Sequence, residues 1–288
     1  MPNYTDRVFR PPAEADSLIL QLAVGCPHNT CTFCGMHKGV RYRLRSEAEM
    51  LDYIRAAAAE FPAADRLFLA DGDFLHVPFD LLRAVLAECQ RAFPRLARVT
   101  SYANGSSIVA KTPEQLTELR RLKLSILYLG LETGDDALLR QVRKGEDSAT
   151  MIAAVRRAQD AGLRVSVMVL LGLGGRAGSD RHIAESARVL NLMQPRLLSA
   201  LRLIEVPGLR LYDGYETVSE YQSVCELRNL IAALELERTV FAANHVSIPV
   251  PIQGRLPHDK VNLVAALDHV LATCRLDRRG PGHVPMWL

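Results

Sequence analysis

Apolar runs of strand length alternate with amphipathic stretches of helix length along the whole chain. The runs that predict strands are 17–24, 66–70, 97–102, 124–131, 163–171, 197–204 and 239–243. The stretches that predict helices are 46–59, 79–91, one that begins at Thr112, 148–161, 179–193, 217–236 and 258–274. Because strands that alternate with helices form parallel sheets with right-handed crossovers, this pattern predicts an α/β fold.

The predicted strands are nearly continuous apolar runs, which is typical of strands covered on both faces. Six of them lie between Leu18 and Ile204 and a shorter seventh follows, so the sequence predicts a partial barrel. An open, doubly wound sheet is the alternative. The glycine-rich turn after Leu171 does not stand in the first strand–helix unit, where a dinucleotide-binding pattern belongs, and this favours the barrel.

Three cysteines, Cys26, Cys31 and Cys34, lie within nine residues directly after the first apolar run. Gly25 allows a sharp turn there, so the thiols follow the carboxyl end of a strand, where α/β barrels place their active sites. Thiolates favour iron–sulfur clusters or zinc, and three of them would leave one corner of a cubane cluster open. A structural zinc site that includes His28 or His37 is the alternative.

Composition narrows the classes of function. The chain has 288 residues, of which 49% are hydrophobic and 23% charged, and its net charge of +3 is spread among interspersed acidic and basic residues. This argues against nucleic-acid and membrane partners. The apolar runs are too short to span a membrane, the first residues lack the pattern of a secretory signal, and six cysteines are too few for a disulfide scaffold. We therefore expect a cytoplasmic protein. Cys89, Cys225 and Cys274 fall in predicted helices, and we expect them to be core residues.

Later motifs follow the cysteines in a distinctive order. Gly130-Leu-Glu-Thr-Gly-Asp-Asp and Arg143-Lys-Gly precede a predicted helix, and the next strand ends in Gly172-Leu-Gly-Gly175. Over residues 17–205 this order resembles the radical SAM superfamily, in particular its branch of oxygen-independent coproporphyrinogen III oxidases and methylthiotransferases. The first gap between the cysteines has four residues, where the family has three, which indicates a separate subgroup.

The resemblance implies a partial (β/α)6 TIM-like barrel over residues 17–205, with an N-terminal extension over 1–16 and a short C-terminal extension over 206–288. It also implies that the three cysteines hold a [4Fe-4S] cluster whose fourth iron binds S-adenosyl-L-methionine (SAM). Reductive cleavage of SAM would give a 5'-deoxyadenosyl radical that abstracts hydrogen from a small or medium organic substrate, with electrons from a donor such as flavodoxin or ferredoxin. The alternative is a non-catalytic cluster- or haem-binding, chaperone-like protein on the same barrel.

The resemblance further implies residues that contact SAM, namely Phe33, Asp71, Gly72, Asp73, Asn104, Glu132, Gly172 and Gly174. Asp71-Gly72-Asp73 stands where the family has Gly-Gly-Glu, which holds the methionine ammonium, and either carboxylate could instead serve a turn. Glu132, at the tip of an apolar strand, is expected to contact ribose or methionine, with an ion pair to Arg143 or Lys144 as the alternative.

Residues that could contact the substrate follow from their positions. Asn244 and His245 come directly after the last predicted strand, so we expect them at the open end of the barrel. Arg43 alternates with Arg41 and Arg45 just after the cysteines and could bind a carboxylate or phosphate. For His245 the alternative is a structural role, and for the three arginines it is a solvated surface position or a helix cap.

Overall fold

The computed structural model describes residues 4, 8–206 and 208–283 of the chain. The chain divides into two compact units, which are described separately. Unit 1 comprises Met1–Asn29, Met36–Leu129 and Ala153–Val165, and unit 2 comprises Thr30–Gly35, Gly130–Ile152 and Ser166–Leu288.

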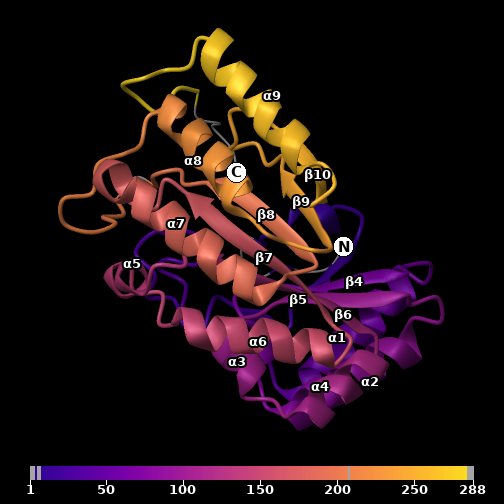
Figure 1. Ribbon diagram of the computed structural model, residues 1–288. Helices are drawn as coiled ribbons and strands as arrows, with labels where there is room; N and C mark the ends of the chain where they lie inside the picture. Colours follow the sequence, from indigo (N-terminus) through magenta and orange to yellow (C-terminus); the bar gives the residue numbers. More distant parts are fainter. Residues whose placement is uncertain (1–3, 5–7, 207, 284–288) are drawn as a thin grey trace. The chain divides into compact units, whose positions relative to one another are not determined.

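The strands form a largely parallel sheet in sequential order (Figure 1). Its members are β1 (Leu18–Leu20), β4 (Arg66–Leu69), β5 (Arg98–Tyr102), β6 (Leu124–Glu132), β7 (Arg164–Leu171), β8 (Leu197–Arg202), β9 (Thr239–Ala243) and β10 (Ile252–Leu256). The order is β1-β4-β5-β6-β7-β8-β9-β10, without the reversal that marks a doubly wound sheet. The α/β fold of the partial TIM-like barrel type is therefore confirmed.

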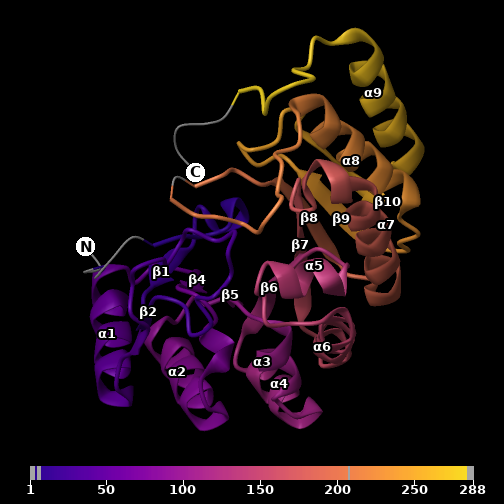
Figure 2. The ribbon, with the colours of Figure 1, turned by 90° about the vertical axis from the view of Figure 1, so that its left-hand side faces the viewer.

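Helices follow the strands of unit 1, largely where the sequence predicts them. They are α1 (Glu47–Glu60), α2 (Phe79–Ala92), α3 (Gly105–Val109), α4 (Pro113–Arg121) and, continuing from unit 2, α6 (Ser148–Asp160), with 3-10 turns η1 (Pro12–Glu14) and η2 (Phe74–His76). Ser46 and Thr112 form the N-terminal capping boxes of α1 and α4. Helices α1, α2 and α4 lie side by side along the strands of this unit (Figure 2).

The first apolar run does not form one strand. It divides into β1 and β2 (Ala23–Val24), and β2 pairs with β3 (Arg43–Leu44) in a separate antiparallel ladder. Gln21 lies between the two parts, buried, and its Nε2 donates a hydrogen bond to Asp71 Oδ2 at 2.7 Å. Four residues thus separate the end of β1 in the main sheet from Gly25, where the cysteine loop begins to turn.

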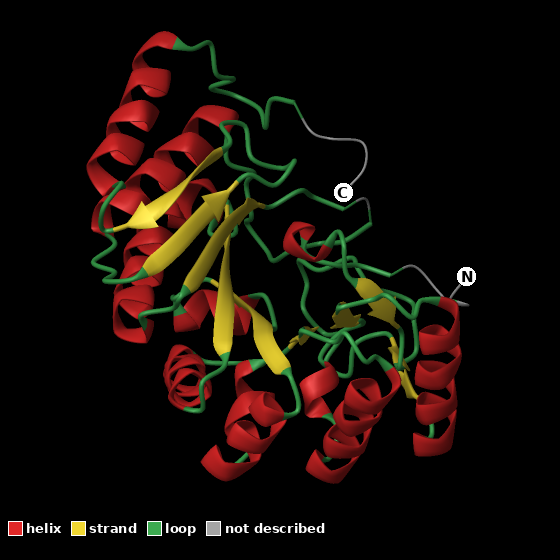
Figure 3. Ribbon diagram, turned by 90° about the vertical axis from the view of Figure 1, so that its right-hand side faces the viewer, coloured by secondary structure: helices red, strands yellow, loops and turns green. Residues whose placement is uncertain are grey.

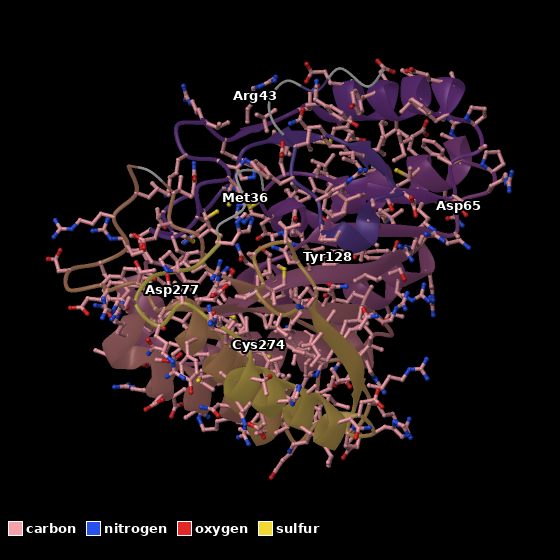
Figure 4. All side chains as sticks on the ribbon, turned by 90° about the horizontal axis from the view of Figure 1, so that it is seen from above. Met36, Arg43, Asp65, Tyr128, Cys274 and Asp277 are labelled. Atoms are coloured by element: carbon pink, nitrogen blue, oxygen red, sulfur yellow. The ribbon has the colours of Figure 1, made fainter. Side chains whose placement is uncertain are left out.

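A buried polar group from the N-terminal extension stabilises the interior of unit 1. Glu14 has no exposed surface, and its carboxylate accepts hydrogen bonds from Tyr128 Oη at 2.6 Å and Ser17 Oγ at 2.5 Å. Burial raises the pKa of Tyr128, a residue of β6 that is labelled in Figure 4. Arg98 pairs with the same carboxylate at 3.4 Å, so the buried charge is compensated.

In unit 2, α5 (Asp136–Gln141), α7 (Gly175–Met193), α8 (Glu220–Ala233) and α9 (Lys260–Thr273) accompany the strands. Helices α7, α8 and α9 pack in succession on one face of the sheet (Figure 3). The pairs β7–β8 and β8–β9 are parallel, but β10 runs antiparallel to β9 and was not predicted. It is an edge strand whose glycine and alternating polar residues hide the apolar signal.

The three cysteines outside the triad differ in burial. Cys89 is fully buried in α2, as predicted, and burial raises the pKa of its thiol to about 12. Cys225 is half-buried, and Cys274 is exposed at the C-terminal end of α9 (Figure 4). The prediction of a core position was wrong for Cys274, because the last turn of this helix lies at the surface. No helix formed by the described residues is long and apolar enough to cross a membrane.

Candidate functional site

The turn after β4 packs directly on the first cysteine of the triad. Gly72 follows β4 with φ +23°, and a Cβ atom added there would lie 2.5 Å from Cys26 Cα and 2.8 Å from Cys26 Cβ. Real Cβ atoms do not approach other heavy atoms so closely, so this position requires glycine. Unit 1 therefore brings together Cys26 and Gly72, which the sequence separates by a whole strand–helix unit.

The two aspartates that flank Gly72 are buried and held by side chains of unit 1. Asp71 has the left-handed φ of +70° and accepts the hydrogen bond from Gln21. Asp73 accepts one from Ser107 of α3. Burial lowers the pKa of Lys111, and the negative charge of Asp73 partly counteracts this effect. The acidic turn is thus a fixed, polar feature at the carboxyl end of β4.

Asn104, one of the residues expected to contact SAM, stands at the N-cap of α3. Its backbone is extended, its side chain makes no capping hydrogen bond, and the residue is half-buried. It therefore lies at the carboxyl end of β5, the next strand along from β4 in unit 1.

In the long first gap of the triad, Asn29 is hydrogen-bonded to the chain that follows the triad. This residue has φ +34°, and its Nδ2 donates hydrogen bonds to the carbonyl oxygens of His37 at 2.8 Å and Val40 at 3.3 Å. His37 is buried, packs edge-on against Phe9 and accepts a hydrogen bond from Gly72 N at 3.5 Å. Among the described residues, no three His, Cys, Asp or Glu side chains are grouped as ligands of a single metal ion.

The segment that carries Cys31 and Cys34 is anchored within unit 2. Thr32 N donates to Val142 O at 2.9 Å, and Thr30 Oγ1 donates to Arg143 O at 3.2 Å. Cys31 therefore lies between two residues that are both hydrogen-bonded to the turn after α5. Its thiol and that of Cys34 are partly exposed.

The side chain of Phe33 anchors the same segment. It packs on a buried hydrophobic cluster formed by Leu138, Val142, Leu173 and Leu211. This contact orients the loop between Cys31 and Cys34 from the side of the α5 turn. A contact of Phe33 with SAM stays a prediction.

Glu132 ends β6 in a left-handed conformation, with φ +64°, and pairs with Lys144. Glu132 Oε1 lies 3.4 Å from Lys144 Nζ, and the two side chains are only 14% and 9% exposed. A Cβ atom on Gly130 would collide with the Glu132 carboxylate, so glycine leaves the space in which the pair forms. Burial acts to lower the pKa of Lys144, but the negative charges of Glu132 and Cys31 outweigh it and raise the pKa above its ordinary value.

The turn after β7 is held by side chains that come from far later in the chain. Gly172 N donates to Glu226 Oε2 at 2.6 Å, and Gly172 O accepts from Tyr215 Oη at 3.2 Å. A Cβ atom on Gly172 would lie 3.0 Å from Val218, and one on Gly174 would lie 2.8 Å from the Cβ of His182. The left-handed backbone of Gly172, with φ +85°, and the close contacts at Gly174 both favour glycine at these positions.

Sequence reasoning missed Glu226. This carboxyl group on α8 is 2% exposed, and its second oxygen accepts from Ser179 Oγ at 2.6 Å. Burial raises its pKa to about 7. No local pattern marks the residue, because it is one of several acidic residues along the chain and only the tertiary structure places it on the Gly172 turn.

The rest of the motif that begins at Gly130 serves to dock α7. Thr133 Oγ1 lies 2.8 Å from His182 Nδ1, and Gly134 N donates to Ser186 Oγ at 3.0 Å. Burial lowers the pKa of His182 to about 4, so its ring is neutral. Asp135 pairs with Arg181 at 2.9 Å. Within this motif, Glu132 pairs with Lys144. The three residues after it contact α7.

The predicted substrate residues lie in different surroundings. Arg43 is exposed on β3 (Figure 4). Asn244 is exposed after β9 and donates to Gln253 at 3.4 Å. His245 Nδ1 accepts a hydrogen bond from Ser247 N at 3.2 Å, so the neutral ring carries its proton on Nε2, and burial lowers its pKa. Arg43 belongs to unit 1, whereas Asn244 and His245 belong to unit 2.

Comparison with known families decides the class of protein. The model of the radical SAM superfamily matches residues 20–188, more than half of the chain, and this range contains the cysteine triad, the Asp71–Asp73 turn and Glu132. The chain belongs to the radical SAM superfamily. Members of this superfamily bind a [4Fe-4S] cluster and SAM, and the solved structures that this chain resembles are of such enzymes.

Three solved radical SAM structures share the fold. Coproporphyrinogen III oxidase (HemN) from Escherichia coli is 16% identical with a TM-score of 0.59, over 75% of this chain and 51% of that one. Methylornithine synthase (PylB) is 15% identical with a TM-score of 0.54, over 93% and 83%. The FeFe-hydrogenase maturase HydG from Carboxydothermus hydrogenoformans is 19% identical with a TM-score of 0.52, over 86% and 56%.

Among curated proteins, the uncharacterized protein MJ0486 of Methanocaldococcus jannaschii is 28% identical over 133 residues, which cover 46% of this chain and 38% of that protein. This chain thus spans well under half of that relative and about half of HemN.

The residues of this radical SAM chain fit the cofactors of its superfamily. The triad offers sulfur ligands only, which suits iron in a cluster and not a hard cation. The absent Cβ of Gly72 leaves room for the Cys26 loop, and a buried ammonium lies beside the Cys31 segment. Within unit 2, the ammonium of Lys144 suits a negatively charged group bound to the Cys31 thiol.

Proposed function

We propose that this protein is a radical SAM enzyme that cleaves SAM reductively at a [4Fe-4S] cluster and abstracts hydrogen from a small or medium organic substrate. The cysteine triad inside the matched family region is the observation that carries this proposal. When bound, the cluster and SAM supply the one-electron cleavage and the hydrogen abstraction. The chain supplies the ligands, the packing around them and the exclusion of water.

In this proposal Cys26, Cys31 and Cys34 are the ligands of the cluster. The residues proposed to contact SAM are Phe33, Asp71, Gly72, Asp73, Asn104, Glu132, Gly172 and Gly174. Because both glycines after β7 face protein atoms, they would act by shaping the turn. Glu132 would have to exchange its pair with Lys144 for a group of SAM.

The proposed substrate residues are Arg43, Asn244 and His245. The neutral ring of His245, fixed by Ser247, could donate a hydrogen bond from Nε2. We propose that residues 17–205 form the core barrel and that 1–16 and 206–288 are extensions. The proposed electron donor resembles flavodoxin or ferredoxin. The proposed location is the cytoplasm, where a reducing environment preserves thiolate ligands.

Anaerobic reconstitution with iron and sulfide tests the proposal. The wild-type protein should take up about four irons per chain and form 5'-deoxyadenosine from SAM and dithionite. Replacing Cys26, Cys31 or Cys34 by Ala should abolish both, whereas Cys274→Ala, at an exposed cysteine outside the triad, should change neither.

Two results would contradict the proposal. Stoichiometric zinc in the protein as purified, with no uptake of iron, would indicate a structural zinc site. A full cluster without binding of SAM in calorimetry would instead support a non-catalytic cluster- or haem-binding protein.

A further inference from the structure

The buried ammonium of Lys144 has no role in the functions described so far. Lysine is seldom buried, because removing its charge from water is costly unless an opposite charge compensates it. Here the side chain is 9% exposed and lies 3.4 Å from Glu132 Oε1. Glu132 compensates this charge, and the chain directly before Lys144 contacts the segment that carries Cys31.

Hydrogen bonds hold the segment that carries Cys31 beside Lys144. The two residues on either side of Cys31 are hydrogen-bonded to the two residues directly before Lys144, Thr32 to Val142 at 2.9 Å and Thr30 to Arg143 at 3.2 Å. These contacts hold the Cys31 segment against the chain at Lys144. A thiolate at Cys31, the form in which it would bind a cluster, would therefore add its negative charge to those of Glu132 and Glu146 near Lys144.

We propose that Lys144 is a positioning residue for the cluster, whose charge raises the reduction potential of the [4Fe-4S] couple, with Glu132 opposing it. This inference rests on the proposed function. Reduction adds one electron from a flavodoxin- or ferredoxin-like donor, or from dithionite, to the oxidised cluster and breaks no bond. A nearby cation stabilises the more negative, reduced form, and burial preserves this effect from screening by solvent.

The ion pair with Glu132 allows the effect of Lys144 on the potential to be tested through a charge of opposite sign. The missing side chain of Gly130 lets the Glu132 carboxylate fold back toward Lys144, and an added Cβ there would lie 3.2 Å from Lys144 Nζ. Glu132 therefore cancels part of the field of the ammonium. Removing the carboxylate charge should raise the potential, and removing the ammonium should lower it.

The experiment is a redox titration of the reconstituted protein, followed by the EPR signal of the reduced cluster. Lys144→Met should shift the midpoint potential to lower values, Lys144→Arg should keep it near that of the wild type, and Glu132→Gln should shift it to higher values. Arg143→Met is the matched control, because Arg143 is a neighbouring but exposed cation whose charge is screened by water.

An unchanged potential in Lys144→Met, at full iron content, would overturn the inference. If that variant does not hold a cluster, Glu132→Gln decides, since an unchanged or lowered potential there contradicts the inference as well. A wild-type protein that holds a cluster but does not cleave SAM would contradict the proposed function and leave this measurement valid.

Discussion

Gly72 sets the distance between the β4 turn and the first cysteine. We predict that Gly72→Ala lowers the iron content after reconstitution severalfold, because a Cβ atom 2.5 Å from Cys26 Cα must displace one of the two loops. Helix content, measured by circular dichroism, should stay unchanged, since the contact involves loops only.

Gly39→Ala is the control for this substitution. Gly39 also has a positive φ, +78°, but a Cβ atom there would meet nothing within 4 Å. Its iron content should match that of the wild type. Equal losses in the two variants would mean that backbone strain, and not contact with Cys26, controls the loop.

Glu132 shows the limit of sequence reasoning at a single residue. Its position at the tip of an apolar strand marked it as a site residue, with an ion pair to Lys144 as the alternative, and the structure contains that ion pair. A role toward SAM stays a prediction. The sequence could not choose, because the space over Gly130 that admits the pair is a property of the folded strand.

At the scale of elements, residues 133–135 after β6 hold α7 in place through hydrogen bonds and an ion pair. We predict that Gly134→Ala destabilises the protein by about 1–3 kcal/mol, because an added Cβ would collide with the backbone of Glu185 and Ser186. The melting temperature should fall by several degrees. The contact would be with backbone atoms of α7, which have little room to move aside.

Gly178→Ala, within α7, is the matched control. A Cβ atom there meets nothing within 4 Å, so the variant should be more stable by about 0.5–1 kcal/mol, as alanine favours helix over glycine. A fall in melting temperature for both variants would mean that α7 tolerates no substitution, irrespective of contact with the motif.

The long elements were predictable and the short ones were not. β4, β7 and β9 were predicted to within one residue, because continuous apolar runs mark buried strands. α3 and α5 were missed, since five or six residues contain too few turns to display a helical period. Helix α7 begins at Gly175, four residues before the predicted start. Its N-cap is Gly174, which has no side chain to cap the helix, so no capping signal in the sequence marks this start.

At the scale of the whole molecule, residues beyond the family match complete the turn after β7. Glu226 is the clearest case, and its pKa of about 7 lies above the ordinary 4.5. The folded state therefore holds a proton that the unfolded state has lost between these pH values. The contribution of Glu226 to the free energy of unfolding therefore falls as pH rises from 4.5 through 7.

We predict that the wild type loses stability relative to Glu226→Gln as pH rises from 5.5 to 8, by on the order of 1–3 kcal/mol. Thermal unfolding of both proteins across this range measures the difference, and contributions of other groups such as His182 cancel. Glu216→Gln, at an exposed residue of the preceding loop, should show no such trend. Parallel pH curves for the wild type and Glu226→Gln would contradict the prediction.

The sequence by itself determined the α/β barrel type of fold, most of its strands and helices, the cysteine triad and the family. These features depend on hydrophobic periodicity and on short motifs, which are local properties of the chain. Only the tertiary structure decided that Gly72 packs on Cys26, that Lys144 lies beside the Cys31 segment, and that Glu226 holds the Gly172 turn. Such contacts join residues far apart in sequence, and the close packing and charge compensation that select them exist only once the chain has folded.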